Sequence, residues 1–447
     1  MLGSPALIHR APPPTLSRRS LLAGALSLSA CGVARSASAP ARRAAPAPAE
    51  EPAAPPPLHA SVAALRRDAP FTCAAVHPSR PWLATGSMRE DSSDWTGQAV
   101  VWDLESCEAV GLSTYEHGFG FEPGPRMLQW SPDGRRFAVA AGTNEIAVIA
   151  PGGAPLLFAP DETRDHTVEF CWWDEQTLYA AAWSDEGDDG LGGGALLSLP
   201  HATTKWLERQ AAPLVLRQPT RARDARAVVG HDDHAVWAID PVAQRLRSRT
   251  PLPGAFHDGR SIAGWSPNGA FGVFAPPAIE RRYDRSLGRD AGGRTELVLF
   301  RPASPRALAQ IEVPGEVVAL RFAPDDRRFV VVSRTAWNGP SHCTVFDGER
   351  KLDGFDAQLA KPPHDFPDAS SLVWSPGADE LALLHADATV EITTLGGRRH
   401  TAWAAPKTRG EVGLVFVGHD RVALIGRQSM RVFDTRGTER LRFDVEA

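Results

Sequence analysis

WSPDGRRFAVAAG, which spans Trp130 to Gly142, is one of four near-copies of a single phrase. WSPNGAFGVFA begins at Trp265, FAPDDRRFVVVS at Phe322 and WSPGADELALLH at Trp374. Each copy closes an apolar run with a turn built from Pro, Asp, Asn or Gly and then opens a second apolar run. A phrase that recurs at long intervals predicts one supersecondary unit that is built several times.

The repeat extends over residues 58 to 447. A third apolar run follows in most copies, as in VVWDLES from Val100 to Ser106, and the starts lie roughly 42 to 57 residues apart, which fits about four strands per unit. Stacking such sheets around a channel buries both apolar faces and protects the edges. We therefore predict an all-β fold, a single β-propeller of eight blades. Seven blades stay open, because the fourth unit, from Ala225 to Arg245, is weak.

The two motifs also carry a family resemblance. VVWDLES resembles the end of a WD40 repeat, and WSPDGRR is similar to a phrase of WD40 and TolB-like propellers. The resemblance covers about 390 residues and implies the propeller fold only. At the end of a third apolar run, only Trp102-Asp103 keeps the Trp-Asp pair, which leaves the buried His-Asp network of ideal WD40 blades an open question.

The N-terminus has the features of an export signal. Residues Ser17 to Gly32 read SRRSLLAGALSLSACG, an arginine pair followed by about ten apolar residues and then small residues before a cysteine. This stretch is too short to span a bilayer, so we expect residues 1–30 to be a cleaved signal peptide. Arg18 and Arg19 resemble a twin-arginine signal, with the general export route as the alternative.

The cysteine that follows is the expected anchor. Leu28-Ser29-Ala30-Cys31 resembles a bacterial lipoprotein box, which implies a lipid-modified Cys31, although a plain cleaved signal stays open. Residues 31–57 are rich in Ala, Pro and Ser, so they predict an extended tether without a core. We expect a cell-envelope protein on the outer membrane or the periplasmic side of a membrane. Gly32 in place of an aspartate favours the outer membrane, with the inner membrane left open.

Loop lengths predict which face binds a partner. If each blade has strands a to d, the b–c loops and d–a connections lie on one face, and the a–b and c–d turns on the other. We name the face with the b–c loops and d–a connections the long-loop face, and the face with the a–b and c–d turns the short-turn face. The long segments all fall on the long-loop face: 88–98, 113–126, 184–194, 276–295, 334–342 and 353–370. Aromatic and arginine side chains are typical interface anchors. The expected partner-binding residues are Trp95, Tyr115, Phe119, Phe121, Arg281, Arg282, Tyr283, Arg285 and Trp337.

Signals for chemistry are sparse. GxSxG, HExxH, Walker-type and CxxC motifs are missing, so we expect no catalytic residue, no cofactor and no metal. A formal charge of -5 supplies no basic stripe for nucleic acid. The sequence therefore favours a membrane-anchored scaffold that binds another protein in the cell envelope. The alternative is an enzyme, or a ligand or metal site at the channel mouth. It would require that His117, Asp185, Asp188, His257 and Glu280 converge in space. A weak calcium site in 185–194 is one form of this alternative.

Buried roles are expected for two further groups. The tryptophans Trp82, Trp130, Trp172, Trp265 and Trp374 fall on strand a or b and predict core positions. Cys73 and Cys171 fall on innermost strands of non-adjacent units, so a disulfide between them is not expected. The two remaining cysteines, apart from Cys31, are Cys107 and Cys343.

Overall fold

The computed structural model divides into two units, Met1–Ala54 and Pro55–Ala447. All strands named below lie in the second unit. The structure describes residues 69–91, 94–117, 127–140, 145–151, 153–158, 167–183, 193–201, 203–207, 216–223, 226–232, 235–252, 262–278, 282–284, 289–291, 293–301, 304, 307–336, 339–360, 370–395, 399–405 and 412–444.

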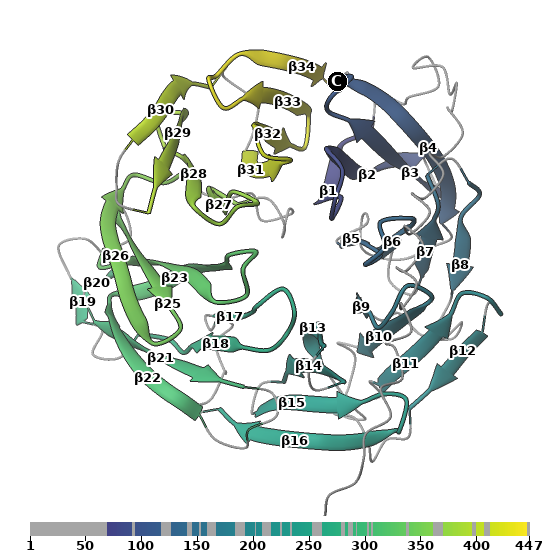
Figure 1. The fold of residues 1–447 in the computed structure, drawn as a ribbon, viewed down its shortest axis with the longest axis horizontal. Coiled ribbons are helices and arrows are strands. Elements are labelled where there is room, and N and C mark those ends of the chain that lie inside the picture. The colour runs from purple at the N-terminus through teal and green to yellow at the C-terminus, as the bar shows by residue number, and fades with distance from the viewer. Residues whose placement is uncertain are drawn as a thin grey trace, which may run out of the picture. The chain divides into compact units, whose positions relative to one another are not determined.

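Eight four-stranded antiparallel sheets form a ring, with the first strand of each sheet nearest the centre (Figure 1). The predicted eight-bladed propeller is therefore confirmed, and the weak fourth unit is a complete blade. The first four blades consist of β1 (Phe71–Val76), β2 (Trp82–Asp91), β3 (Asp94–Asp103) and β4 (Glu108–His117); β5 (Leu128–Trp130), β6 (Phe137–Ala140), β7 (Ile146–Ile149) and β8 (Leu156–Phe158); β9 (Thr167–Trp172), β10 (Thr177–Trp183), β11 (Gly193–Ser198) and β12 (Thr203–Trp206); and β13 (Arg217–Ala222), β14 (Ala227–His231), β15 (Ala235–Asp240) and β16 (Arg245–Pro251).

The second half of the ring repeats the arrangement, with one insertion. The last four blades consist of β17 (Ile262–Trp265), β18 (Gly272–Ala275), β21 (Arg294–Phe300) and β22 (Ala307–Pro314); β23 (Glu316–Phe322), β24 (Arg328–Arg334), β25 (Ser341–Asp347) and β26 (Arg350–Ala357); β27 (Leu372–Trp374), β28 (Glu380–Leu384), β29 (Thr389–Thr394) and β30 (Arg399–Ala404); and β31 (Val412–Val417), β32 (Arg421–Gly426), β33 (Ser429–Asp434) and β34 (Glu439–Asp444). A separate hairpin of β19 (Arg282–Asp284) and β20 (Arg289–Ala291) lies between β18 and β21.

The recurring phrase forms the a–b turn, and local hydrogen bonds explain its residues. In the second blade the N–H of Gly134 donates to the carbonyl of Ser131 at 2.9 Å. The Ser131 hydroxyl accepts the N–H of Arg136 at 3.1 Å, and Asp133 accepts that of Arg135 at 3.0 Å. The residue at the Gly134 position has a positive φ in all four copies: 68° at Gly134, 67° at Gly269, 62° at Asp326 and 59° at Ala378.

Tryptophans that precede a–b turns join neighbouring blades. The indole N–H groups of three such tryptophans donate to a carbonyl on the innermost strand of the preceding blade: Trp130 to Ala75 at 3.1 Å, Trp172 to Gln129 at 3.1 Å and Trp374 to Arg321 at 3.0 Å. The predicted core position of Trp265 is also confirmed, but its indole nitrogen is buried without a hydrogen-bond partner among the described residues. Trp82 is only half-buried and packs edge-on against His77.

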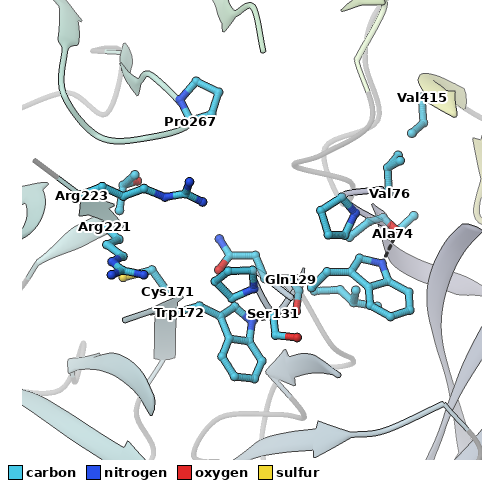
Figure 2. Close-up of a pocket in the computed structure, with 16 residues that line it drawn as sticks. Ala74, Val76, Gln129, Ser131, Cys171, Trp172, Arg221, Arg223, Pro267 and Val415 are labelled. Atoms are coloured by element: carbon cyan, nitrogen blue, oxygen red, sulfur yellow. Dashed lines mark hydrogen bonds between the residues drawn. The ribbon is translucent and has the colours of Figure 1, made fainter. Parts of the chain in front are cut away.

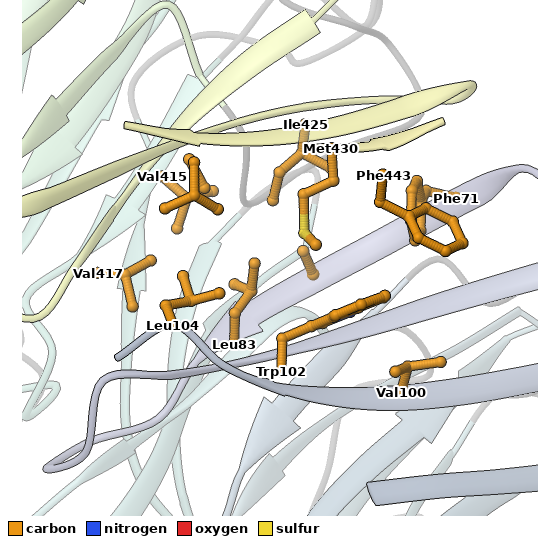
Figure 3. Close-up of a cluster of buried hydrophobic side chains, with 13 residues drawn as sticks. Phe71, Leu83, Val100, Trp102, Leu104, Val415, Val417, Ile425, Met430 and Phe443 are labelled. Atoms are coloured by element: carbon orange, nitrogen blue, oxygen red, sulfur yellow. The ribbon is translucent and has the colours of Figure 1, made fainter. Parts of the chain in front are cut away.

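The apolar core lies between blades. Eight clusters of buried side chains occur in the described part of the chain, one at each interface between neighbouring blades. The cluster in Figure 3 closes the ring, because Phe71 and Trp102 of the first blade pack against Met430 and Phe443 of the last. The ring centroid of Phe443 lies 5.7 Å from that of Phe71 and 5.1 Å from that of Trp102. Burial of apolar area is the main favourable term in folding, so this cluster stabilises the contact between the first and last blades.

Aspartates that end the third strand stabilise the c–d turn. Asp103 accepts the N–H of Glu105 at 2.8 Å, and Asp434 accepts the N–H of Thr438 at 2.9 Å. In the first blade the indole of Trp102 donates to the hydroxyl of Thr85 at 2.9 Å. In this blade Trp102 thus makes a hydrogen bond within the sheet, and Asp103 makes one in the turn.

Parts of several segments predicted as loops are strands. β26 continues to Ala357, so the connection predicted over 353–370 begins only after Ala357. β2 and β3 pair continuously as far as Asp91 and Asp94, so residues 88–98 form the tip of a hairpin. β4 continues to His117 and pairs with β3 along its length, so the d–a connection begins after His117 and not at Ser113. The polar sequence MREDSSDWTGQ has no apolar alternation, which is why the strand period is not visible in it.

Candidate functional site

The predicted partner-binding residues divide into those placed on strands and those outside the described residues. Trp95 lies on β3 opposite His117, and Tyr115 lies on β4 opposite Gly97. Arg282 and Tyr283 lie on β19, within the connection between the second and third strands of the fifth blade. Phe119, Phe121, Arg281, Arg285 and Trp337 lie outside the described residues, as do Arg18, Arg19 and Cys31. Trp95 and Tyr115 thus occupy positions on adjacent strands, two residues apart in the register.

The residues named for a metal or acid–base site are largely beyond the described part. Asp185, Asp188, His257 and Glu280 are outside it, as is most of 185–194. Within the described residues, no group of three or more His, Cys, Asp or Glu side chains is placed to hold a metal ion. In that same part, no helix is long and apolar enough to cross a membrane.

A cavity of about 430 Å³ opens between the innermost strands, towards the a–b turns of the short-turn face. Its wall comes from the first five blades and the last one, through β1, β5, β9, β13, the turn after β17, and β31. Binding pockets for small ligands have volumes of about 300–1,000 Å³, so the space is large enough to hold a ligand group. Figure 2 shows Val76 and Val415 on one side of this space and Arg221 and Arg223 on the other.

The charge of the cavity wall is positive on one side. Arg221 lies near the end of β13 and Arg223 follows in the turn, and they are the charged side chains among the residues that line the cavity. The guanidinium carbon of Arg221 lies 5.6 Å from the centroid of a Trp173 ring, a cation–π distance. Arg223 is exposed, and its N–H donates to the carbonyl of Asn268 in the next blade at 3.0 Å.

The Cys171 thiol in the cavity wall is not an activated nucleophile. Burial raises the pKa of the Cys171 thiol, against the opposing effect of Arg221, so the thiol is protonated at neutral pH. Tyr179 behind it is fully buried, and burial raises its pKa as well. The arrangement can bind an anion through arginine, but these groups do not supply general acid–base chemistry near pH 7.

Sequence reasoning did not identify this site. Gln129, Cys171, Arg221 and Arg223 come from three different blades and share no local motif. The one available signal was the position of Arg221-Ala222-Arg223 at the end of an innermost strand, and it falls in the blade whose repeat is weakest.

Together, the ring of eight four-stranded sheets and the tryptophan-linked turns define an eight-bladed β-propeller. Sqt1 of Chaetomium thermophilum, in a crystal structure bound to the N-terminus of ribosomal protein L10, is similar with a TM-score of 0.55 and 17% identity over 83% of this chain and 98% of that chain. The Dos1 propeller is similar with a TM-score of 0.54 and 10% identity over 84% of this chain and 95% of that chain. No family model and no curated protein matches the sequence. At these identities the likeness shows the fold alone.

Proposed function

We propose that this chain is a lipid-anchored propeller that binds a protein partner in the cell envelope. The arginine pair, short apolar stretch and cysteine of SRRSLLAGALSLSACG support export and lipid modification of Cys31. The Ala/Pro-rich segment up to residue 57 would hold the propeller away from the membrane surface. The propeller itself resembles WD40 protein-interaction domains, and the Sqt1 structure contains a bound segment of a ribosomal protein.

The partner contact is assigned to one face of the ring because the two faces differ in their loops. On the short-turn face, the a–b turns are tight and held by their own hydrogen bonds, as at Ser131 and Gly134. On the long-loop face, the β2–β3 hairpin is prolonged to Asp91 and Asp94, and the β19–β20 hairpin is added. We assign the partner contact to these two hairpins, with Trp95, Tyr115 and Tyr283 as anchors and Arg282 beside them.

The anchor is tested by lipid labelling of cells that express the full chain. Wild type should incorporate an alkyne-labelled fatty acid and fractionate with membranes, whereas Cys31→Ser should lose the label and become extractable without detergent. Arg18→Lys with Arg19→Lys should block export if the twin-arginine route is used. Membrane fractionation of Cys31→Ser equal to that of wild type would contradict the anchor.

The partner face is tested by crosslinking in native membranes followed by affinity purification. Trp95→Ala with Tyr283→Ala should lose a specific protein that wild type captures. Arg350→Ala with Leu352→Ala is the matched control, because both side chains are exposed on β26 at the outer edge of the sixth blade. Equal capture by all three proteins would reject the long-loop face as the contact.

A further inference from the structure

The short-turn mouth of the channel has an unassigned site with a one-sided charge. Arg221 and Arg223 are the charged residues of its described lining, and neither forms an ion pair with a carboxylate among the described residues. Other arginines near turns are engaged: Arg327 contacts Asp347 at 2.9 Å and Arg440 contacts Asp434 at 3.0 Å. Among the described residues, the cavity therefore presents a positive charge that no carboxylate pairs with.

The rest of the wall combines apolar side chains with the polar Gln129, Ser131 and Thr220, and parts of it are held in place. Figure 2 shows Val76 and Val415 across the space from the arginines and Trp172 beside them. Pro78 of the first blade also lines the cavity. Trp172 is fixed by its indole hydrogen bond to Gln129 at 3.1 Å. The backbone of Arg223 is fixed by its hydrogen bond to Asn268. A wall that is already ordered loses little conformational entropy when a ligand binds.

We propose that this cavity binds an acidic peptide segment, in which a carboxylate pairs with Arg221 and Arg223 and neighbouring apolar side chains contact Val76, Trp172 and Val415. Arginine pairs with carboxylates through parallel N–H···O bonds, so the guanidinium groups determine the acidic position. The apolar part of the wall favours a peptide as the occupant, because an inorganic anion would leave Val76, Trp172 and Val415 in contact with water. A peptide segment satisfies both sides of the cavity at once.

This site is separate from the proposed partner face. The cavity opens towards the a–b turns, whereas Trp95 and Tyr283 belong to the b–c hairpins. Loss of one site should therefore leave the other unchanged, and each can fail independently in experiment.

The test uses the purified full chain and fluorescein-labelled, N-acetylated hexapeptides. The peptides carry one central Glu flanked by Leu, Val and Pro in varied order, and a second series carries Gln in place of Glu. Fluorescence polarisation should detect binding of the Glu series, weakening as salt is raised because the ion pair is partly exposed. Arg221→Ala with Arg223→Ala should reduce affinity at least tenfold, and the Gln series should be weaker by a similar factor. Arg350→Ala, an exposed arginine outside the cavity, is the matched control.

Three results would overturn the proposal. The first is an affinity of the double variant equal to that of wild type, with thermal unfolding showing that both are folded. The second is a Glu series that binds no better than the Gln series, or no binding by any peptide. The third is competition by sodium glutarate at the same concentration as the best peptide, which would assign the site to a small carboxylate instead.

Discussion

The indole nitrogen of Trp172 lies 3.1 Å from the carbonyl oxygen of Gln129, so the last residue of one innermost strand is bonded to the innermost strand of the preceding blade. The same bond recurs between Trp374 and Arg321 at 3.0 Å. Trp265 occupies the equivalent position in the fifth blade, but its indole nitrogen has no partner among the described residues. The three tryptophans thus separate the effect of the hydrogen bond from that of the buried ring.

We expect Trp172→Phe and Trp374→Phe to lower the free energy of unfolding by about 1–2 kcal/mol, because each removes one hydrogen bond between blades. Trp265→Phe should cost less or stabilise, because it removes a buried donor that has no acceptor. Urea unfolding followed by circular dichroism measures all three variants. Equal losses in the three would show that the ring alone, and not the bond, joins the blades.

Gly269 and Gly348 separate backbone conformation from steric contact. Gly269 has a φ of 67°, and a Cβ added there would lie 2.5 Å from the carbonyl oxygen of Arg221 and 2.8 Å from the Cα of Ala222. Gly348 has a φ of 56°, but no atom lies within 4 Å of an added Cβ. Gly348→Ala should therefore cost only the left-handed backbone penalty, about 1–2 kcal/mol.

Gly269→Ala should cost about 2–5 kcal/mol in total, since the contact with the fourth blade adds to the backbone penalty. Melting temperatures of the two variants, measured side by side, test the difference. A Gly269→Ala protein as stable as Gly348→Ala would mean that the turn moves away from the fourth blade at no cost.

The sequence could predict the ring because the determinants of the a–b turn are local. Ser131, Asp133 and Gly134 form their hydrogen bonds within six residues, so the motif is visible in one dimension. The fourth blade lacks this motif and contains Pro219 within its first strand, yet Val228, Val229 and Ile239 are fully buried. Packing against neighbouring blades completes that sheet, and packing of this kind has no short sequence motif.

The cavity could not be predicted for a related reason. Val76, Cys171 and Val415 belong to three blades that meet only after the ring closes. The prolonged β2–β3 hairpin was missed because its pairing is carried by the backbone, and its side chains do not alternate between apolar and polar. Local chemistry thus specifies the turns, while ring geometry specifies the site.

The cysteines should differ strongly in reactivity in the native protein. Cys107 lies in a c–d turn and is partly exposed, whereas Cys73, Cys171 and Cys343 are buried. Burial raises the pKa of Cys343 to about 12, so its reactive thiolate is scarce at pH 8. We expect N-ethylmaleimide to label Cys107 first, as measured by peptide mass mapping.

Cys107→Ser should abolish this early labelling, and urea should expose the three buried thiols. Labelling of Cys171 as fast as that of Cys107 in native protein would contradict the burial of its thiol. Peptide mapping assigns each modification separately, so Cys31 does not enter the comparison.

His77 should make the stability of the propeller depend on pH. Its ring is buried between Trp82 and Trp130, accepts the N–H groups of Ser79 and Arg80 at Nδ1, and places Nε2 3.0 Å from the carbonyl of Gly134. Burial lowers the pKa of His77 from 6.5 to about 4; the Gly134 carbonyl opposes the shift, Arg80 adds to it and Asp133 opposes it. The folded state therefore keeps the ring neutral.

Between pH 6.5 and about 4, the unfolded chain binds a proton at this histidine that the folded chain does not, so stability falls as the pH falls through this window. The loss attributable to His77 should reach at most about 3 kcal/mol below pH 4. His77→Asn, which keeps an acceptor and a donor, should be less stable at pH 7 but show a flatter dependence. Asp240 and Asp434 are common to both proteins, and their pKa values lie below the ordinary 3.8, so their effects begin at lower pH. Urea midpoints at pH 7, 6, 5 and 4.5 give the two slopes, and identical slopes would reject His77 as their source.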